Sequence, residues 1–370
     1  MIFCANPSAQ FKSYQSEIEK AVLSVMRSKN YILGKEVSAL EREFAHYIET
    51  DFAIGVANGT DAIEIALRAL EIGAGDEVIT VSHTAVATVA AIEATGAKPV
   101  LVDIESDFYT LNPSQLDEVF TEKTKAVIAV HLYGQSADLD AILNFCQKNS
   151  LFLVEDASQA HGAKFKGKRL GSIGHLGCFS CYPTKNLGAI GDAGLITTND
   201  STLKDKVRML REYGWINRES IIPGRNSRLD ELQAAILRIK LKYLDLDNEK
   251  RLKLSRNYVD KLSNLPQVIT PKTRPTGNPV FHLFVIQAED RQNLLNYLKD
   301  KGIYAGVHYS LPVHLHPAYI DRVSKATEMI ETENLVKKII SLPIYPELSI
   351  DDSNLVADEI SNFYNLHVKN

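Results

Sequence analysis

A regular alternation of strand-like and helix-like segments between residues 52 and 155 constrains the fold of this chain more than any other feature. Short apolar runs of strand length are separated by longer segments in which apolar residues follow helical spacing. The predicted strands are 52–57, 77–81, 99–103, 126–131 and 151–155, and the predicted helices are 62–70, 85–95, 113–120 and 137–148. Such alternation predicts an α/β fold with a mostly parallel sheet covered by helices on both faces.

Segments outside this region complete the predicted architecture. Strands at 176–182 and 192–198 bring the predicted sheet to seven strands, and helices at 14–27 and 37–47 precede it, while helices at 201–213 and 229–246 follow it. Beyond residue 250 we expect helix 249–265, strand 280–287, helix 290–301 and strand 305–307. The sequence therefore predicts a large domain over residues 1–248 and a smaller α/β domain over 249–370.

Composition narrows the class of protein. The chain has 370 residues, of which 45% are hydrophobic and 24% charged, with a formal net charge of −5. These values are ordinary for a globular protein and show no basic stripe that would bind nucleic acid. The N-terminus lacks a signal-peptide pattern and no apolar run is long enough to span a bilayer, so we expect a cytoplasmic protein without a membrane partner.

The four cysteines indicate neither a disulfide framework nor a metal site. Their distribution is typical of a reducing compartment. Cys178 and Cys181 form a C-x-x-C pair, but a strand points positions three apart to opposite faces, and no second pair completes four ligands. We expect no metal.

A single lysine in a glycine-rich loop is the first candidate for chemistry. Lys185 follows the predicted strand 176–182 and is surrounded by Asn186, Gly188, Gly191 and Gly194, with almost no charged neighbours in the sequence. Burial in such a loop lowers the pKa of an amine and makes it a nucleophile or Schiff-base former. The alternative is a lysine that extends from the loop to solvent.

Polar residues gather where the predicted strands end. Ser82 and His83, His131, and Asp156 each follow or end a strand, and binding sites in parallel sheets lie at the carboxyl ends of the strands. The turn 58–61 leads from the first strand into a helix, whose N-terminus favours a phosphate. Simple N-capping by this turn is the alternative explanation.

Three sequence blocks carry a family resemblance. E-D-A-S-Q-A-H-G-A at 155–163, F-S-C-Y-P-T-K-N-L-G-A-I-G-D-A-G at 179–194 and G-R-N-S-R-L-D-E-L-Q-A-A-I-L at 224–237 resemble, in order, the signature blocks of the DegT/StrS-like sugar aminotransferases, which use pyridoxal phosphate and have fold type I. The resemblance extends from about residue 31 to residue 345. It implies a fold type I transferase with pyridoxal 5'-phosphate as cofactor.

The resemblance also implies roles for individual residues. Lys185 would hold the cofactor through a Schiff base and then act as the proton-transferring base, and Asp156 would contact the pyridine nitrogen. The remaining cofactor-binding residues implied are Gly59, Thr60 and Ser180 at the phosphate, Gln159 at the phenolic oxygen, and Asn226, which would reach the cofactor phosphate of the partner in a homodimer with shared active sites. A lysine at position 185 argues against the dehydratase branch of the family, which has histidine there.

The chain departs from the family pattern at one position. Ala85 stands where the family usually has an aromatic residue that stacks on the cofactor, and we therefore expect His83 to take that place, a structural histidine being the alternative. Substrate contacts are expected from Tyr31, Tyr182, His308, Tyr309 and His314. The last three belong to a group with His316 whose side chains suit a sugar or a diphosphate, with a metal site as the weaker alternative.

Within the family, the blocks are most similar to members that aminate carbon 3 of thymidine-diphosphate (dTDP) 3-keto-6-deoxyhexoses. The expected activity is transfer of an amino group from L-glutamate to such a sugar, in the biosynthesis of an amino deoxysugar for a surface polysaccharide such as O-antigen or for a glycosylated metabolite. Alternatives are a 4-keto nucleotide sugar or a keto-inositol as acceptor, and a non-catalytic regulator that binds pyridoxal phosphate.

Overall fold

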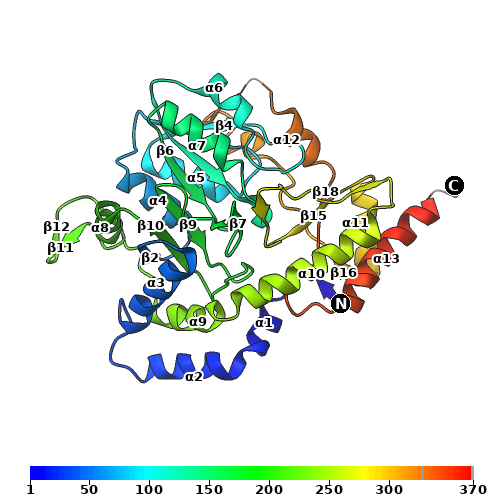
Figure 1. Cartoon of the computed structure of the whole chain (residues 1–370), viewed down its shortest axis with the longest axis horizontal. Helices are drawn as coiled ribbons and strands as arrows, with labels where there is room; N and C mark the ends of the chain where they lie inside the picture. The colour runs from blue at the N-terminus through cyan, green and yellow to red at the C-terminus, as the bar shows by residue number, and fades with distance from the viewer. Residues whose placement is uncertain (327, 368–370) are drawn as a thin grey trace.

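The computed structural model describes residues 1–326 and 328–367 and is built around one large sheet (Figure 1). Within these residues the sheet has eight strands in the order β17-β4-β3-β5-β6-β9-β10-β2. They are β2 (Phe52–Val56), β3 (Glu77–Val81), β4 (Lys98–Val102), β5 (Thr124–Val130), β6 (Phe152–Asp156), β9 (Leu176–Ser180), β10 (Gly194–Thr198) and β17 (Ser324–Lys325). All seven predicted strands are present, and the two-residue edge strand β17 adds an eighth that the sequence did not predict.

The sheet is mostly parallel, as predicted. Strands from β17 to β9 run parallel, and β10 runs antiparallel to both β9 and β2. Most strands bury four or more consecutive side chains. Because successive side chains point to opposite faces of a strand, this burial shows that both faces of the sheet are covered.

Helices between the strands provide most of this cover. They are α4 (Gly59–Ala69), α5 (Val86–Thr95), the short helices η1 (Pro113–Gln115), α6 (Leu116–Val119) and η2 (Leu132–Gly134), then α7 (Leu139–Lys148) and α8 (Ser201–Leu210). α4 packs against β9 and β10, and α7 packs against β5 and β6. The predicted helix 113–120 is therefore present as two short consecutive helices.

The N-terminal segment forms three helices rather than two. α1 (Pro7–Ser13) was not predicted and precedes α2 (Gln15–Met26) and α3 (Lys35–Ile48). Both α2 and α3 pack against α9 (Glu231–Leu241), at the lower edge of the molecule in Figure 1.

The prediction of helices at 229–246 and 249–265 was wrong about where one ends and the next begins. A turn at Lys242 and Tyr243 separates α9 from α10 (Leu244–Leu262). The Tyr243 ring stacks on Tyr14 with centroids 4.3 Å apart, so packing against the N-terminal segment marks the break. The predicted domain boundary between residues 248 and 249 falls inside α10 and remains a prediction.

The C-terminal part has its own small antiparallel sheet and hydrophobic cluster. The sheet contains β13 (Val268–Ile269), β15 (Phe284–Ala288) and β18 (Ile339–Leu342), and helices α10, α11 (Arg291–Asp300) and α13 (Ile350–His367) lie beside it (Figure 1). β15 is shorter than the predicted strand 280–287, because Phe281 has a left-handed backbone with φ of 43°. The strand predicted at 305–307 instead occupies β16 (Ile303–Tyr304), which pairs with β1 (Ile2–Phe3).

Small elements complete the fold. They are β7 (Lys164–Phe165), β8 (Lys168–Arg169) and β14 (Gly277–Asn278) in one small sheet, the hairpin β11 (Trp215–Ile216) and β12 (Glu219–Ser220), and helices η3 (Val313–Leu315) and α12 (Ile330–Leu335). None of the helices in the described part of the chain combines the length and the apolar character needed to cross a bilayer.

Candidate active site

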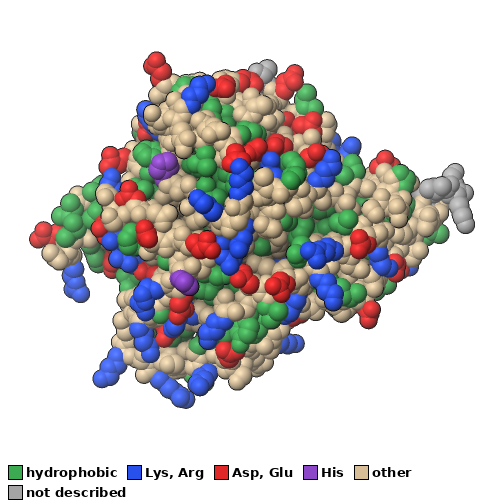
Figure 2. Space-filling model, in the orientation of Figure 1, with side chains coloured by type: hydrophobic (Ala, Val, Ile, Leu, Met, Phe, Trp, Pro, Cys, Tyr) green, Lys and Arg blue, Asp and Glu red, His purple; other side chains and the backbone are tan. Residues whose placement is uncertain are grey.

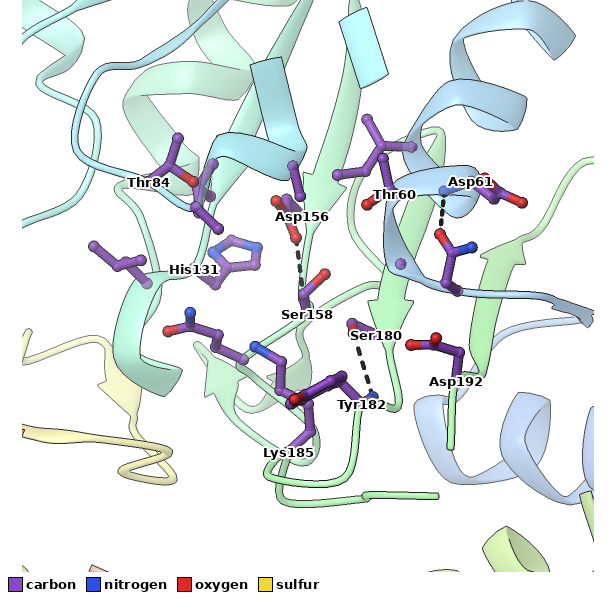
Figure 3. Close-up of a pocket in the computed structure, with 18 residues that line it drawn as sticks. Thr60, Asp61, Thr84, His131, Asp156, Ser158, Ser180, Tyr182, Lys185 and Asp192 are labelled. Atoms are coloured by element: carbon purple, nitrogen blue, oxygen red, sulfur yellow. Dashed lines mark hydrogen bonds between the residues drawn. The ribbon is translucent and has the colours of Figure 1, made fainter. Parts of the chain in front are cut away.

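A cavity of about 450 Å³ lies at the carboxyl ends of the central strands (Figure 3). It brings together seven of the predicted site residues, which are Gly59, Thr60, Asp156, Gln159, Ser180, Tyr182 and Lys185. His131, which the sequence placed at a strand end, also lines the cavity, and lining residues that the sequence did not single out include Thr84, Ser158 and Asp192. The cavity therefore lies at the strand ends, where the sequence predicts the site.

Lys185 presents a buried amine to this cavity. Burial lowers the pKa of Lys185 to about 8 because desolvation disfavours the ammonium form, and the nearby Asp156 carboxylate only partly offsets this effect. In Figure 3, Lys185 and Tyr182 lie across the cavity from Asp156 and Thr84. The amine can therefore be neutral, and hence nucleophilic, near physiological pH.

The loop that carries Lys185 is held from behind by buried polar groups. The Asn186 side-chain amide donates to Asn248 Oδ1 at 2.8 Å, and the buried Lys240 ammonium donates to the Gly188 carbonyl oxygen at 2.7 Å. A Cβ at Gly188 would lie 2.4 Å from the Pro183 carbonyl oxygen, so the close turn needs glycine there. These contacts come from helices α9 and α10, and spacing in the sequence does not indicate them.

Asp156 ends strand β6 and presents its carboxylate to the cavity. Its Oδ2 accepts a hydrogen bond from the Thr88 hydroxyl at 2.8 Å, and its Oδ1 accepts one from the Ser158 backbone N–H at 3.2 Å. The adjacent Glu155 does not line the cavity and instead accepts hydrogen bonds from backbone N–H groups of residues 171–174. This placement agrees with the expectation that the two neighbouring carboxylates point to opposite sides of the strand.

The N-terminus of α4 forms the other end of the cavity. The Asn58 side chain accepts from the Asp61 backbone N–H at 2.8 Å, so the predicted capping is present. The remaining first-turn N–H groups have no partner within the helix, and the Thr60 and Ser180 hydroxyls lie beside them. A Cβ at Gly59 would lie 2.5 Å from Ser180 Cβ, so only glycine allows this close approach. The turn is therefore capped and still has first-turn N–H groups that could bind an anion.

The prediction that His83 stacks on the cofactor is wrong for this structure. Its side chain has no exposed surface and does not line the cavity. Its Nε2 lies 2.6 Å from the Tyr133 hydroxyl, which donates to the His308 carbonyl oxygen, and burial lowers the pKa of His83 to about 4. A fully enclosed ring cannot stack on a bound cofactor, and His83 instead has the structural role that the sequence left as the alternative.

The histidines and tyrosine after β16 do not form one cluster. Tyr309 is not among the residues that line the cavity, but its hydroxyl accepts a hydrogen bond at 3.2 Å from Nε2 of Gln159, which does line it. His308 Nδ1 contacts the Ser341 hydroxyl instead, at 2.9 Å. His314 is buried, with its Nδ1 2.6 Å from the Ser82 hydroxyl and its Nε2 3.2 Å from Glu333 Oε1. The structure therefore does not bring it to the cavity, contrary to the predicted contact with substrate.

Two predicted residues lie outside the cavity on the surface. Tyr31 is 56% exposed, and its hydroxyl donates to the Met26 carbonyl oxygen at 3.1 Å. Asn226 is exposed in the loop that precedes α9. Neither residue lines the cavity of its own chain, so their predicted roles remain predictions.

The residues present fit pyridoxal phosphate. A buried amine with a lowered pKa suits the aldehyde, the Asp156 carboxylate across the cavity suits a protonated pyridine nitrogen, and the glycine-led turn of α4 suits the phosphate. Lys185 would hold the aldehyde carbon, Asp156 the ring nitrogen, and Gly59, Thr60 and Ser180 the phosphate.

Comparison with known proteins agrees with this chemistry. A family model described as the DegT/DnrJ/EryC1/StrS aminotransferase family matches residues 12–361. The chain is 43% identical to a dTDP-3-amino-3,4,6-trideoxy-alpha-D-glucose transaminase of Streptomyces venezuelae, covering 95% of this chain and 93% of that protein. It is also 43% identical to a dTDP-3-amino-3,6-dideoxy-alpha-D-galactopyranose transaminase of Aneurinibacillus thermoaerophilus, covering 95% and 96% of the two chains.

A solved structure shares the whole fold. The crystal structure of S. venezuelae DesV in complex with a ketimine intermediate superposes with a TM-score of 0.95 at 41% identity and covers 98% of each chain. The matched region contains the cavity, the lysine loop and the α4 turn. This chain belongs to the DegT/DnrJ/EryC1/StrS family of pyridoxal-phosphate-dependent aminotransferases.

Proposed function

We propose that this aminotransferase moves an amino group from L-glutamate to carbon 3 of a dTDP-linked 3-keto-6-deoxyhexose. The observation that carries the proposal is the Lys185 amine facing the Asp156 carboxylate across one cavity, in a chain 43% identical to two enzymes named for 3-amino dTDP sugars. The product would be an amino deoxysugar for a surface polysaccharide such as O-antigen or for a glycosylated metabolite.

The cofactor supplies the electron sink for this chemistry, and the protein positions the reacting groups. The Lys185 amine, with a pKa of about 8, can both accept and release a proton at Nζ near neutral pH. With the cofactor bound, the Asp156 carboxylate would stabilise a proton on the pyridine nitrogen, because a carboxylate that only accepts hydrogen bonds favours the protonated, charged form of that nitrogen. These two residues carry the catalytic roles in the proposal.

Gln159 has a defined orientation toward the cavity. Its Oε1 accepts a hydrogen bond from the Tyr133 backbone N–H at 2.7 Å, and its Nε2 donates to the Tyr309 hydroxyl at 3.2 Å. An amide nitrogen carries two hydrogens, so one remains for the phenolic oxygen of the cofactor. The flipped amide would turn its NH2 group toward the Tyr133 backbone N–H, so that two donors would face each other, and the backbone therefore sets the orientation of the amide.

The charges around the cavity support sites shared between two copies of the chain. Among the described residues, the Asp, Glu, Lys and Arg side chains that line it are Asp61, Asp156, Asp192 and Lys185. A cofactor phosphate and a sugar diphosphate both add negative charge, while the one lysine among the described lining residues, Lys185, is assigned to the cofactor aldehyde. Additional donors therefore have to come from outside this set of residues.

The loop before α9 is suited to supply them to a second copy. Its hairpin β11–β12 projects from the body of the molecule in Figure 1, and hydrophobic side chains gather over it in Figure 2. Trp215, Ile216 and Ile221 are exposed there, and Asn226 follows on the same loop. We propose a homodimer in which Asn226 of each copy reaches the cofactor phosphate of the other.

Hybrid dimers test the shared site. Co-expression of Lys185→Ala with Asn226→Asp subunits should restore part of the activity that each variant lacks alone, since one hybrid site then combines a normal lysine with a normal asparagine. Asn217→Ala, in the same projecting hairpin, is the matched control and should keep normal cofactor affinity. An active monomer in sedimentation experiments would reject the shared site.

A panel of keto substrates tests the proposed reaction. The purified holoenzyme, with L-glutamate, is offered a dTDP-3-keto-6-deoxyhexose, a dTDP-4-keto-6-deoxyhexose and a keto-inositol, and amino products are identified by mass spectrometry. We expect product from the 3-keto sugar. Turnover of only a 4-keto sugar or the inositol would reject the assignment, and no half-reaction with any amino donor would favour a non-catalytic regulator.

A further inference from the structure

A chain of hydroxyl groups leads from the cavity wall to the Asp156 carboxylate. Thr84 lines the cavity, while Thr88 is fully buried behind it in the first turn of α5. The Thr84 and Thr88 hydroxyl oxygens are 3.0 Å apart, and the Thr88 hydroxyl is 2.8 Å from Asp156 Oδ2. The helix that follows β3 thus contacts a carboxylate at the end of β6.

The direction of these hydrogen bonds follows from chemistry. An ionised carboxylate only accepts, so the single hydroxyl hydrogen of Thr88 is donated to Asp156. Thr88 then has only acceptor capacity for its other neighbour, and the Thr84 hydroxyl donates to it. The chain runs in one direction, from Thr84 through Thr88 to Asp156, and each bond polarises the next.

Two donors on different oxygens hold the carboxylate in one orientation. Thr88 contacts Oδ2, and the Ser158 backbone N–H contacts Oδ1 at 3.2 Å. Rotation of the carboxylate about its terminal bond would break both contacts. A carboxylate has about four acceptor positions, so acceptor capacity remains on the side that faces the cavity.

We propose that Thr88, supported by Thr84, is a positioning residue that orients the Asp156 carboxylate and donates a hydrogen bond to it, so that a proton shared with a pyridine nitrogen would stay on the nitrogen. The proposal rests on the role given to Asp156 in the proposed function. Hydrogen bonds donated to a carboxylate favour its ionised form, and loss of the Thr88 donor shifts a shared proton toward the carboxylate oxygen. The pyridine ring of the cofactor would then withdraw electrons less well, because its nitrogen would be less protonated.

Nitrogen NMR of the holoenzyme reads the position of that proton directly. The protein is loaded with pyridoxal phosphate labelled at its ring nitrogen, and the resonance of Thr88→Val is compared with that of the unmodified protein. We expect a shift toward the unprotonated position, with a roughly tenfold slower half-reaction with L-glutamate. Thr88→Ser keeps a hydroxyl at this position and should restore both properties.

Thr80→Val is the matched control. Thr80 is also fully buried, on the neighbouring strand β3, and its hydroxyl donates to the Ile128 carbonyl oxygen at 3.2 Å rather than to a site residue. The Thr80→Val variant should leave the resonance of the cofactor's ring nitrogen unchanged. Because Thr88 is enclosed, Thr88→Ala and Thr84→Val are made in parallel, and we expect the same direction of shift, smaller for Thr84→Val.

The outcomes separate this inference from the proposed function. An unchanged resonance in every folded variant that lacks the Thr88 hydroxyl would overturn the positioning role. Asp156→Asn supplies the second comparison. If Asp156→Asn shifts the resonance and the threonine variants do not, only the threonine inference fails, whereas an unchanged resonance in Asp156→Asn rejects the role of Asp156 itself.

Discussion

Glu155 and His131 form a fully enclosed pair beside the cavity, with His131 Nε2 3.0 Å from Glu155 Oε2 and no exposed surface on either side chain. His131 Nδ1 accepts a hydrogen bond from the Ala137 backbone N–H at 3.1 Å, so the hydrogen on Nε2 is the one donated to Glu155. Although His131 lines the cavity, both of its ring nitrogens are already engaged. The pair therefore supports the site and leaves no ring nitrogen for a ligand.

Glu155→Gln should destabilise the protein strongly. Glu155 also accepts backbone N–H bonds from Gly171, Ile173 and Gly174, and an amide nitrogen in place of one oxygen would face these donors. We expect the free energy of unfolding to fall by about 2–4 kcal/mol. Urea titration measures it, with the exposed Glu289→Gln as control. Equal stability of Glu155→Gln and the unmodified protein would contradict the buried network.

The stabilisation by Glu155 should depend on pH in a defined direction. Burial raises the pKa of Glu155, but the hydrogen bonds donated by His131 and by the backbone N–H groups of Gly171 and Gly174 outweigh this effect, so the pKa lies below the ordinary value. A lowered carboxyl pKa contributes stability above the unfolded value, and that contribution is lost as pH falls through the folded value. The difference in free energy of unfolding between the unmodified protein and Glu155→Gln should therefore become smaller as the pH is lowered. A difference that stays constant with pH would contradict this explanation.

Borohydride reduction should attach the cofactor to Lys185 alone. Peptide mapping of the reduced holoenzyme is expected to find the label on the 185 peptide, and Lys185→Ala should lose both the label and the aminotransferase half-reaction while the circular dichroism spectrum is retained. Lys240 is an internal control, because burial also lowers its pKa to about 8 but its ammonium contacts Gly188 and Gln10 behind the loop. A label on Lys240 would contradict the site.

The reactivity of Lys185 should rise with pH around a midpoint near 8. Only the neutral amine attacks an aldehyde, and the pKa of Lys185 is lowered to about 8 by burial. The rate at which the apoprotein captures pyridoxal phosphate should increase through this pH and level off above it. An ordinary lysine would continue to gain reactivity up to about pH 10.4, so a midpoint there would show that the amine is not desolvated.

Gly59→Ala should weaken cofactor binding. The added Cβ would lie 2.5 Å from Ser180 Cβ, which forces the start of α4 away from the end of β9. We expect the dissociation constant for pyridoxal phosphate to rise at least about tenfold, because the first-turn N–H groups no longer converge on the phosphate. Fluorescence titration of the apoprotein measures this, with Gly73→Ala as control, where a Cβ would meet its nearest neighbour at 3.3 Å. Unchanged affinity would show that the close approach is not needed.

The sequence alone determined the strands, most of the helices and the central residues of the site. Apolar periodicity is a local property, so it indicated β2 to β10 of the main sheet and the helices between them. Motif resemblance and the rule for strand ends placed Asp156 and Lys185 in one site, and the structure brings both to one cavity.

Only the tertiary structure decided which side chains support these residues. Thr88 meets Asp156, 68 positions away, because α5 packs back toward the end of β6. His83 contacts the Tyr133 hydroxyl, 50 positions away, and is fully buried. β17 pairs with β4 from a segment more than two hundred residues later. Such contacts depend on how whole elements pack, and the free energy of packing has no local signature in the sequence.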